Sequence, residues 1–557
     1  MKNTKWYENA IIYQIYPRSF MDSNNDGLGD IPGIISKLDY LKELGVNCVW
    51  LSPVYDSPQQ DNGYDIKNYV DIYPPFGNLD DFKLMLDEMH KRGIRLIMDL
   101  VVNHTSDEHK WFIEAKKSKD NPYRDYYIWK KGKGKKNKRP NNWLGFFGAP
   151  AWEYDKTTDE YYLHLFDKKQ PDLNWENPKI IEEVKSLMKF WLDMGVDGFR
   201  CDVINLISKD QRFKSSLQIP AGAKYYVNGP RLHEFLHEIN KDVLSNYDCM
   251  TVGETAFTTL EDARLLTAPE RQELNTIFNF DHTSSDNFMG IKWLYRKFSL
   301  PRMKKSFKKW QVGNIWGWNT LFIENHDQRR CVGRFNTNDK ELRVESSKML
   351  GTMCYFQKGT PYIYQGQEIG MTNAYFKDLN QYQDTEVFTI HKLLTKLHLP
   401  KKFIDFTIPN GARDNARTPM QWDDSEYAGF SKSKPWLSVN ENKSYINVEE
   451  AKKDPNSILN YYKKLIQVHK EQKEIINKGD YVDLCINHKK IYAYTRTYNN
   501  ETLLCISNFS NKETKYKLPK HLLNKEKELL LNNYEVSNIN EETLILKPYE
   551  TRLYKLK

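Results

Sequence analysis

The chain has 557 residues, which exceeds one ordinary domain and predicts about two or three domains. Its 82 lysines and arginines against 74 aspartates and glutamates give a net charge of +8, too mild over this length to indicate a nucleic-acid-binding protein. The seven cysteines are scattered and form no CxxC pair, a pattern that fits neither a disulfide framework nor a zinc site and favours a reducing compartment.

The first segment, "MKNTKWYENAIIYQIYPRSF" (1–20), lacks the cationic start, the long apolar stretch and the cleavage site of a signal peptide. No window of the sequence approaches the apolar length needed to cross a bilayer. We therefore expect a cytoplasmic protein with no membrane partner.

Eight short runs rich in β-branched or aromatic residues recur along the chain, and polar residues follow each run. Helical patterns lie between them: residues 34–45 and 80–93 both repeat apolar positions at helical spacing. Alternation of strand and helix eight times predicts an α/β protein with a parallel (β/α)8 TIM barrel. The expected strands lie in residues 11–17, 48–55, 94–104, 198–205, 250–255, 275–280, 318–327 and 360–368.

Two stretches depart from this alternation. Residues 105–172 are rich in Trp, Tyr, Lys and Asn and lose helical periodicity early, which predicts a domain inserted after the third strand. In residues 479–557, strand-like runs are separated by Asn-rich turns, which predicts a C-terminal antiparallel domain resembling a β-sandwich. The barrel would then comprise residues 1–104 and 173–478.

The run "KKGKGKKNKRPNNW" (130–143) is the one strong charge cluster. A solvated loop is the favoured interpretation, and polyanion binding is the alternative, because clustered charge alone is weak evidence. We expect no nucleic-acid partner.

Polar residues follow four of the predicted strands as a coherent set. In a barrel enzyme the carboxyl ends of the strands meet at one mouth, where the reactive groups lie. A single Asp or Glu there is more typical of a helix cap or an ion pair, but a full set favours a catalytic site. The set comprises His104, Arg200, Asp202, Glu254, His326 and Asp327.

Three carboxylates at one mouth suit glycosidic bond cleavage, which requires one ionised and one protonated carboxyl group facing each other. Asp202 suits the nucleophile, because nearby Arg200 would stabilise the carboxylate and lower its pKa. Glu254 follows an apolar strand and suits the acid that protonates the leaving oxygen.

The segments "DLVVNHTS", "GFRCDVIN", "TVGET" and "ENHD" resemble the four short regions of the α-amylase superfamily, glycoside hydrolase family thirteen, and "QPDLNW" resembles its fifth region. Longer motifs extend the resemblance along nearly the whole chain to the bacterial oligo-1,6-glucosidase group. They are "YQIYPRSFMDSNNDGLGDIPGI", "SPQQDNGYDI", "KGTPYIYQGQEIGMTN" and "RDNARTPMQWD".

The resemblance implies a retaining glycoside hydrolase with Asp202 as nucleophile and Glu254 as general acid and base. Asp327 would fix the distorted sugar as positive charge develops on it, which an anion stabilises. Further residues match positions that line the terminal-glucose subsite, where polar groups bind hydroxyls and aromatic rings meet the C–H face. These residues are Asp61, Tyr64, His104, Phe166, Arg200, His326 and Arg413.

The loop "DSNNDGLGD" (22–30) places oxygen donors at alternate positions around a glycine turn, as calcium loops do. It departs from the EF-hand pattern, because position twelve is Gly33 rather than glutamate, and an Asx-rich turn is the alternative interpretation. The resemblance implies a structural Ca²⁺ ion, with Mg²⁺ as the other candidate. The expected ligands are Asp22, Asn24, Asp26, Asp30 and the carbonyl of Leu28.

Some positions depart from the family pattern. Cys201 replaces a common methionine or leucine, a soft apolar exchange. Arg329 stands where proline is usual, and Gly333 where serine is usual, in the segment after Asp327. The segment "TAFTT" after Glu254 also differs from the sequence expected of the oligo-1,6-glucosidase group. The sugar that the enzyme prefers on the acceptor (leaving-group) side of the site therefore stays open.

Val203 offers a clue to the linkage. Relatives that act on α-1,6 bonds typically carry valine directly after the aspartate of the second region, and α-1,4-preferring relatives carry alanine or threonine. We expect a monomeric enzyme that removes glucose from the end of isomaltose and other small isomalto-oligosaccharides.

Other functions stay open, because sucrose isomerases and trehalose-6-phosphate hydrolases also carry this valine. The isomerase signature "RLDRD" is absent before the fourth region, but sucrose- or α-1,4-active glucosidases remain candidates. A phosphosugar hydrolase would need extra cations at the acceptor side, for which Arg329 is a candidate. From another class, a non-catalytic transporter partner of the same fold would carry a membrane span and lack the acids.

Overall fold

The computed structural model describes residues 5–218, 220–288, 291–337, 339–536 and 541–557. Eight strands lie in one parallel sheet in the order β11-β10-β9-β5-β2-β1-β15-β14. A parallel bridge joins Thr276 of the outer strand β11 to Trp318, two residues before the other outer strand, β14, so the sheet closes and the predicted barrel is confirmed. The strands are β1 (Ile12–Ile15), β2 (Cys48–Leu51), β5 (Arg95–Leu100), β9 (Gly198–Cys201), β10 (Met250–Glu254), β11 (Thr276–Phe278), β14 (Thr320–Leu321) and β15 (Thr360–Tyr364).

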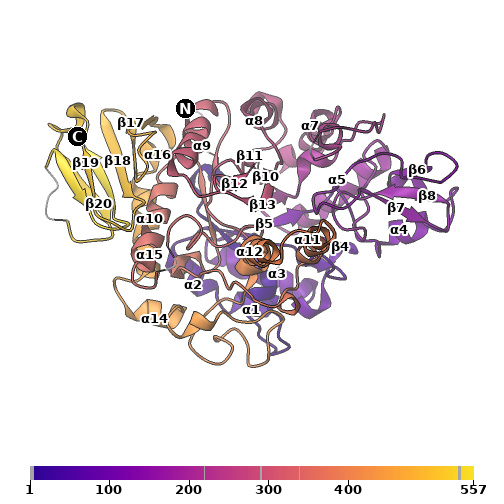
Figure 1. Ribbon diagram of the computed structural model, residues 1–557, viewed down its shortest axis with the longest axis horizontal. Helices are drawn as coiled ribbons and strands as arrows, with labels where there is room; N and C mark the ends of the chain where they lie inside the picture. Colours follow the sequence, from indigo (N-terminus) through magenta and orange to yellow (C-terminus); the bar gives the residue numbers. More distant parts are fainter. Residues whose placement is uncertain (1–4, 219, 289–290, 338, 537–540) are drawn as a thin grey trace.

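Helices follow the strands and surround the barrel (Figure 1). The helix expected over residues 34–45 is two helices, α1 (Ile31–Ile35) and α2 (Leu38–Leu44). Ser36 Oγ donates to the Gly33 carbonyl at 2.7 Å where α1 ends, a local bond that competes with helix continuation. The other main helices are α3 (Leu79–Lys91), α5 (Pro178–Asp193), α7 (Leu232–Asp242), α8 (Leu260–Thr267), α9 (Leu300–Gly313), α10 (Arg343–Tyr355) and α15 (Ile458–Glu471).

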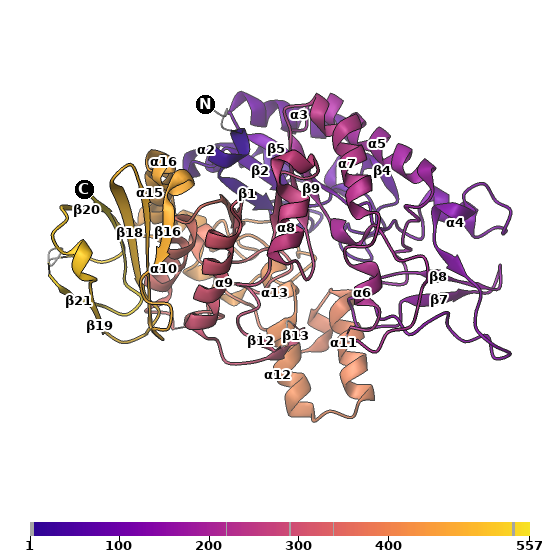
Figure 2. The ribbon, with the colours of Figure 1, turned by 90° about the horizontal axis from the view of Figure 1, so that it is seen from above.

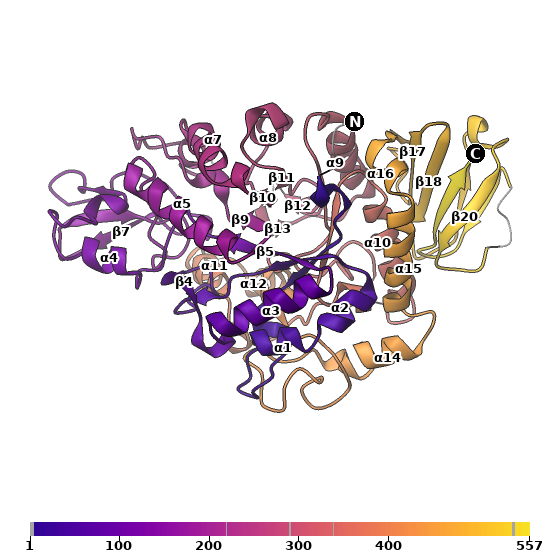
Figure 3. The same cartoon turned by 180° about the vertical axis from the view of Figure 1, so that it is seen from behind.

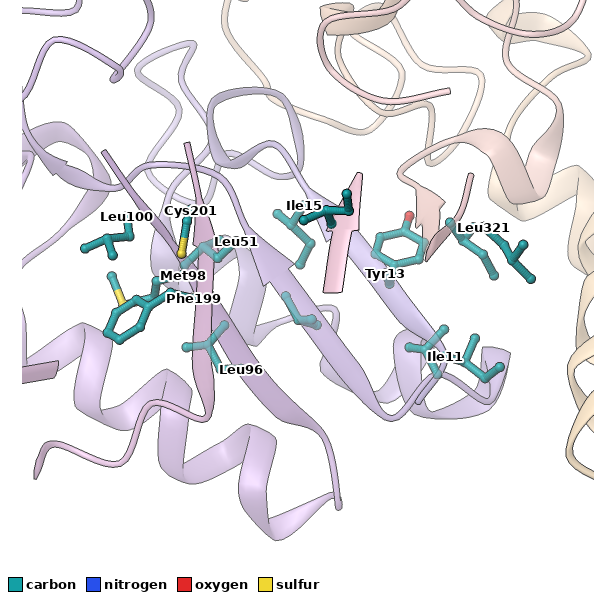
Figure 4. Close-up of a cluster of buried hydrophobic side chains, with 14 of the residues drawn as sticks. Ile11, Tyr13, Ile15, Leu51, Leu96, Met98, Leu100, Phe199, Cys201 and Leu321 are labelled. Carbon is teal, nitrogen blue, oxygen red and sulfur yellow. The ribbon is translucent and has the colours of Figure 1, made fainter. Parts of the chain in front are cut away.

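Alternation along the barrel strands separates two buried layers. One set of side chains packs outward against the helices; Figure 4 shows Tyr13, Leu96 and Phe199 among them. The intervening residues, such as Trp50 and Val252, form a second cluster inside the barrel. Because side chains alternate with period two along a strand, the inward set at the carboxyl ends is polar and includes Gln14, Asp99, Arg200 and Glu254.

Two further units lie at opposite ends of the molecule (Figures 1 and 3). Between β5 and α5, a three-stranded antiparallel sheet, order β6-β8-β7, accompanies helix α4 (Lys110–Ala115). At the other end, a five-stranded antiparallel sheet, order β16-β17-β18-β22-β20, accompanies the pair β19-β21. The strands are β6 (Trp129–Lys130), β7 (Trp152–Asp155), β8 (Glu160–Leu163), β16 (Asp480–Asp483), β17 (Ile491–Tyr498), β18 (Glu501–Asn508), β19 (Thr514–Lys517), β20 (Lys527–Asn532), β21 (Thr543–Leu546) and β22 (Thr551–Leu556).

A helical hairpin, α11 (Thr385–Lys396) and α12 (Lys401–Gly411), projects from the barrel and was not expected from the sequence (Figure 2). It packs against the short antiparallel pair β12 (Asn287–Phe288) and β13 (Ile291–Tyr295) through an apolar cluster that includes Trp293, Ile390 and Ile408. Among the residues that the structure describes, no helix combines the length and apolar composition needed to cross a bilayer.

Candidate active site

Arg200 lies at the centre of the barrel mouth and contacts three carboxylates. Strand register pairs it with Asp99 on β5, and with Val252 on β10, two residues before Glu254. Its Nη1 lies 2.6 Å from Asp99 Oδ1 and 2.5 Å from Asp202 Oδ1, and its Nη2 lies 2.7 Å from Glu254 Oε2. The Arg200 side chain is 1% exposed, so this guanidinium is a buried, fixed cation.

Burial sets the pKa values of these carboxyl groups. It raises the pKa of Asp202 to about 6; Arg200 lowers this pKa, as expected from the sequence, but the effect of burial is larger and the net shift is upward. Burial raises the pKa of Glu254 further, to about 7, and the negative charges of Asp202 and Asp327 add to the effect. The order of the two pKa values suits an ionised Asp202 beside a protonated Glu254.

Asp327 lies in the loop after β14 and contacts three nitrogen-bearing side chains. Its carboxylate lies 3.1 Å from His326 Nε2, 2.9 Å from Arg417 Nη2 and 3.2 Å from Arg413 Nη1. Burial alone would raise its pKa, but these neighbours hold the pKa of Asp327 well below its ordinary value. Asp327 therefore stays ionised whenever Glu254 is protonated near neutral pH.

His326 has a defined tautomer. The Gln14 side-chain amide lies 2.7 Å from His326 Nδ1 and can only donate there, so the ring proton lies on Nε2. Burial lowers the pKa of His326, which keeps the ring neutral. Its Nε2 is 2.6 Å from the Tyr64 hydroxyl, and the two rings stack 3° from parallel. His326 and Tyr64 thus form a rigid wall beside Asp327.

The remaining predicted substrate residues continue this wall. Arg413 Nη2 donates to Asp61 Oδ1 at 2.9 Å, and both side chains are buried. His104 Nε2 lies 3.1 Å from the Tyr64 carbonyl, and its ring centroid is 5.1 Å from that of Phe166. Contacts therefore link every one of these predicted residues to the carboxylates at the barrel mouth.

Val203 directly follows Asp202 and adopts a positive φ of 35°, which is uncommon for a β-branched residue. Its backbone N–H lies 3.3 Å from Glu254 Oε2, so the unusual backbone conformation directs a donor at the general acid candidate. Its side chain packs against a buried apolar cluster that includes Trp143 and Leu163 of the inserted unit. Val203 is thus in contact with both Glu254 and that cluster.

Several residues of this network were not identified from the sequence. Asp99 is fully buried, bonds Arg200 and Trp50 Nε1, and its pKa is raised by burial to about 6. An aspartate inside the apolar run "IRLIMDLVVNH" was a signal of the same kind as Asp202. Arg417 lies one helical turn after Arg413, which the spacing could have indicated. Asp384, which holds Arg413 through bonds of 2.8 and 2.6 Å, had no such signal.

The predicted calcium loop folds on itself. Asp22 accepts the backbone N–H groups of Asn24, Asn25 and Gly27, and Asp30 accepts those of Ser23 and Gly33. Within the described ranges, no three His, Cys, Asp or Glu side chains gather closely enough to form a metal cluster. The donor chemistry of the loop still fits Ca²⁺, because carboxylate, amide and carbonyl oxygens are the ligands that this ion prefers.

A TIM barrel with a buried carboxylate pair and a third, ionised aspartate at its mouth defines a glycoside hydrolase. Residues 14–479 match the family model described as alpha amylase, catalytic domain, and residues 491–553 match the alpha-amylase SusG C-terminal domain. The chain belongs to the α-amylase family, as its sequence motifs indicated.

Named relatives narrow the comparison. The chain is 56% identical to an oligo-1,6-glucosidase of Parageobacillus thermoglucosidasius, over 99% of each chain. It is 46% identical to a trehalose-6-phosphate hydrolase of Bacillus subtilis, over 100% of this chain and 99% of the relative. An isomaltulose synthase variant from Erwinia rhapontici NX5, solved with sucrose, superposes with a TM-score of 0.96 at 40% identity, over 100% of each chain.

Proposed function

We propose that this enzyme is a retaining, exo-acting α-glucosidase that hydrolyses the α-1,6 bonds of isomaltose and short isomalto-oligosaccharides. The observation that carries the mechanism is the buried Arg200 guanidinium bound to both Asp202 and Glu254. The linkage is supported by the oligo-1,6-glucosidase relatives, at 48–56% identity over nearly the full chain.

In this mechanism, Asp202 attacks the anomeric carbon while Glu254 gives its proton to the departing glycosidic oxygen. The bond to the leaving sugar breaks as a covalent glucosyl ester forms on Asp202. Glu254, now ionised, removes a proton from water, and the resulting hydroxide releases glucose and restores Asp202. Asp327 stabilises the positive charge that develops on the sugar ring in both steps.

The exo action follows from the proposed glucose subsite. The buried Asp61–Arg413 ion pair, with His104 and Phe166, would close the inner end of the pocket around one terminal glucose. Polar groups there bind hydroxyls, and the Phe166 ring offers a face to the sugar C–H bonds. A chain that continued beyond this ring would meet these buried side chains.

The first test is the ratio of kcat/KM for isomaltose to kcat/KM for maltose on one preparation, because this ratio expresses the difference in transition-state stabilisation between the bonds. We expect a strong preference for isomaltose. Asp202→Asn should reduce turnover by at least roughly a thousandfold while the protein keeps its melting temperature within a few degrees. A preference for maltose would reject the proposed linkage. A fully active Asp202→Asn variant would reject Asp202 as the nucleophile.

Val203 is the proposed determinant of that linkage, since it directly follows Asp202 and its backbone N–H lies 3.3 Å from Glu254 Oε2. Val203→Thr should raise maltose cleavage relative to isomaltose by a few fold, because the two side chains have similar shape but different polarity. The measurement is the same kcat/KM ratio for the variant and the native enzyme. An unchanged ratio would remove Val203 as the determinant.

Trehalose-6-phosphate hydrolysis is the second candidate, because a relative with that name is 46% identical over the whole chain. A phosphosugar needs free cations at the acceptor side. Arg329, the cation expected there, is bound to Asp286 at 2.7 Å. We therefore expect kcat/KM for trehalose-6-phosphate to lie well below that for isomaltose, and the reverse order would replace the proposal.

For the loop of residues 22–30, we propose a structural Ca²⁺ ion, which would bridge the loop's oxygen donors without taking part in the chemistry. A chelator should lower the melting temperature, and added Ca²⁺ should restore it. Asp22→Asn should weaken this response. If neither the chelator nor added Ca²⁺ changes the melting temperature, the proposed ion site is rejected and the loop is an Asx-rich turn.

We also propose that the protein is a cytoplasmic monomer. All seven of its cysteines are free, which suits a reducing compartment, though it does not address assembly. Light scattering during size-exclusion chromatography should give a mass near 66.1 kDa. A mass of twice that value would reject the monomer.

A further inference from the structure

Arg329 lies two residues after Asp327 and contacts two other segments of the chain. Its Nη2 is 2.7 Å from Asp286 Oδ2, and its Nη1 donates to Asn410 Oδ1 at 2.9 Å. The guanidinium carbon lies 4.8 Å from the centroid of the Tyr295 ring. The side chain is only 13% exposed, so its charge is committed to these partners.

The Asp286 partner is a rigid anchor. Its carboxylate is 3% exposed and also accepts bonds from Arg334, from Nε at 3.0 Å and from Nη2 at 2.9 Å. Asp286 directly precedes β12, and Tyr295 ends β13, so Arg329 attaches the Asp327 loop to this hairpin. Two cations around one buried carboxylate fix the position of that loop.

The Asn410 partner leads to the other side of the site. It lies near the end of α12, three residues before Arg413. A Cβ atom at Gly411 would lie 2.3 Å from the Trp293 ring, so the end of α12 is pressed against β13. Arg329 therefore joins the segment that carries Asp327 to the segment that carries Arg413, and those two side chains meet at 3.2 Å.

We propose that Arg329 is a positioning residue that fixes Asp327 and Arg413 relative to each other. It touches no substrate and acts through the placement of the anion that faces the developing positive charge. The inference rests on the proposed function, because it requires Asp327 to act in the transition state. A displacement of Asp327 by a fraction of an ångström would weaken binding of the transition state more than binding of glucose.

The experiment compares Arg329→Gln and Arg329→Lys with the native enzyme. In Arg329→Gln we expect kcat for isomaltose to fall about tenfold while KM stays within about twofold. Binding of 1-deoxynojirimycin, a protonated glucose mimic, should weaken about tenfold in calorimetry, and binding of glucose should stay within about twofold. Arg329→Lys should restore part of both losses, because it keeps the charge but not the two-point geometry.

Arg552→Gln is the matched control, because Arg552 is also a buried ion-pair residue, 2.5 Å from Glu550, but lies on β22 in the C-terminal sheet. It should lower the melting temperature without changing kcat/KM. Equal weakening of glucose and the iminosugar, or no change in either, would overturn the inference. So would a loss confined to trehalose-6-phosphate, which would make Arg329 an anion-binding residue.

These outcomes separate the inference from the proposed function. A native enzyme that does not hydrolyse isomaltose would reject the substrate. The ratio of iminosugar to glucose binding would still decide the role of Arg329, since it requires no turnover.

Discussion

Arg200 neutralises only one of the three carboxylates that it contacts. Asp99, Asp202 and Glu254 compete for one buried cation, so at least one of them resists ionisation near neutral pH. Asp327 has cations of its own, Arg413 and Arg417, and does not compete. The pKa values of the carboxyl groups therefore differ because three of them share one cation and the fourth contacts two.

This arrangement predicts a narrow bell-shaped pH profile. As the proposed nucleophile, Asp202 must lose its proton to attack, so kcat/KM should rise through about pH 6. As the proposed general acid, Glu254 must keep its proton, so kcat/KM should fall above about pH 7. The measurement is kcat/KM for p-nitrophenyl α-glucoside across both limbs. A profile that stays flat from about pH 5 to 9 would contradict these two assignments, because the titration of Asp202 and Glu254 would then not limit the pH range of activity.

At the scale of single elements, β9 determines the geometry of the site. It is four residues long, yet its register against β5 and β10 sets which carboxylates Arg200 meets. Gly198 begins the strand with a φ of 146°, and a Cβ atom there would lie 2.0 Å from the Met250 carbonyl oxygen. The close approach of β9 to β10 thus depends on the absence of a side chain at this position.

Gly198→Ala should lower the free energy of unfolding by at least about 3 kcal/mol, because the added methyl group combines backbone strain with overlap. Any folded fraction should have reduced kcat, since β9 would shift Arg200 away from Glu254. Chemical denaturation and activity assays measure the two effects. Gly93→Ala is the control: its φ is also positive, at 71°, but no atom lies within 4 Å of the new Cβ, so about 1–2 kcal/mol is expected. Equal losses in both variants would show that overlap with Met250 is unimportant.

The sequence predicted the elements whose signals are local. Each barrel strand was found from a short run rich in β-branched or aromatic residues, and the ends of those runs supplied Asp202, Glu254 and Asp327 as the candidate catalytic residues. The hairpin α11–α12 was missed because it lies in a long stretch after β15 that follows no strand–helix alternation. Asp99 was missed because it precedes the last apolar residues of its run. The raised pKa of Asp202 could not be predicted, since burial opposes Arg200 and is invisible in sequence.

At the scale of the whole molecule, one lysine ties the barrel to the C-terminal sheet. Lys304, on α9, is fully buried, and its Nζ donates to the carbonyls of Cys485 at 2.5 Å and of His488 and Ile491 at 2.8 Å each. These partners all belong to the C-terminal unit, and none is a carboxylate of the barrel mouth. The tether therefore serves stability and not the chemistry.

Lys304→Met should lower the melting temperature by several degrees, because three buried carbonyls would lose their donor. We expect kcat/KM of the folded enzyme to stay within about twofold of the native value. Scanning calorimetry and isomaltose kinetics test the two parts. Lys305→Met, at the exposed neighbouring position, should change neither quantity. A strong loss of kcat/KM in Lys304→Met would instead connect the C-terminal sheet to the site.

The ion pair between Asp61 and Arg413 joins residues 352 positions apart. During synthesis on the ribosome, Asp61 emerges long before its partner has been translated. Asp327 is likewise translated before both of its arginine partners, Arg413 and Arg417. The nascent chain therefore cannot complete the proposed glucose pocket until about three quarters of the protein has been made, so we expect catalytic competence only late in the synthesis of each molecule.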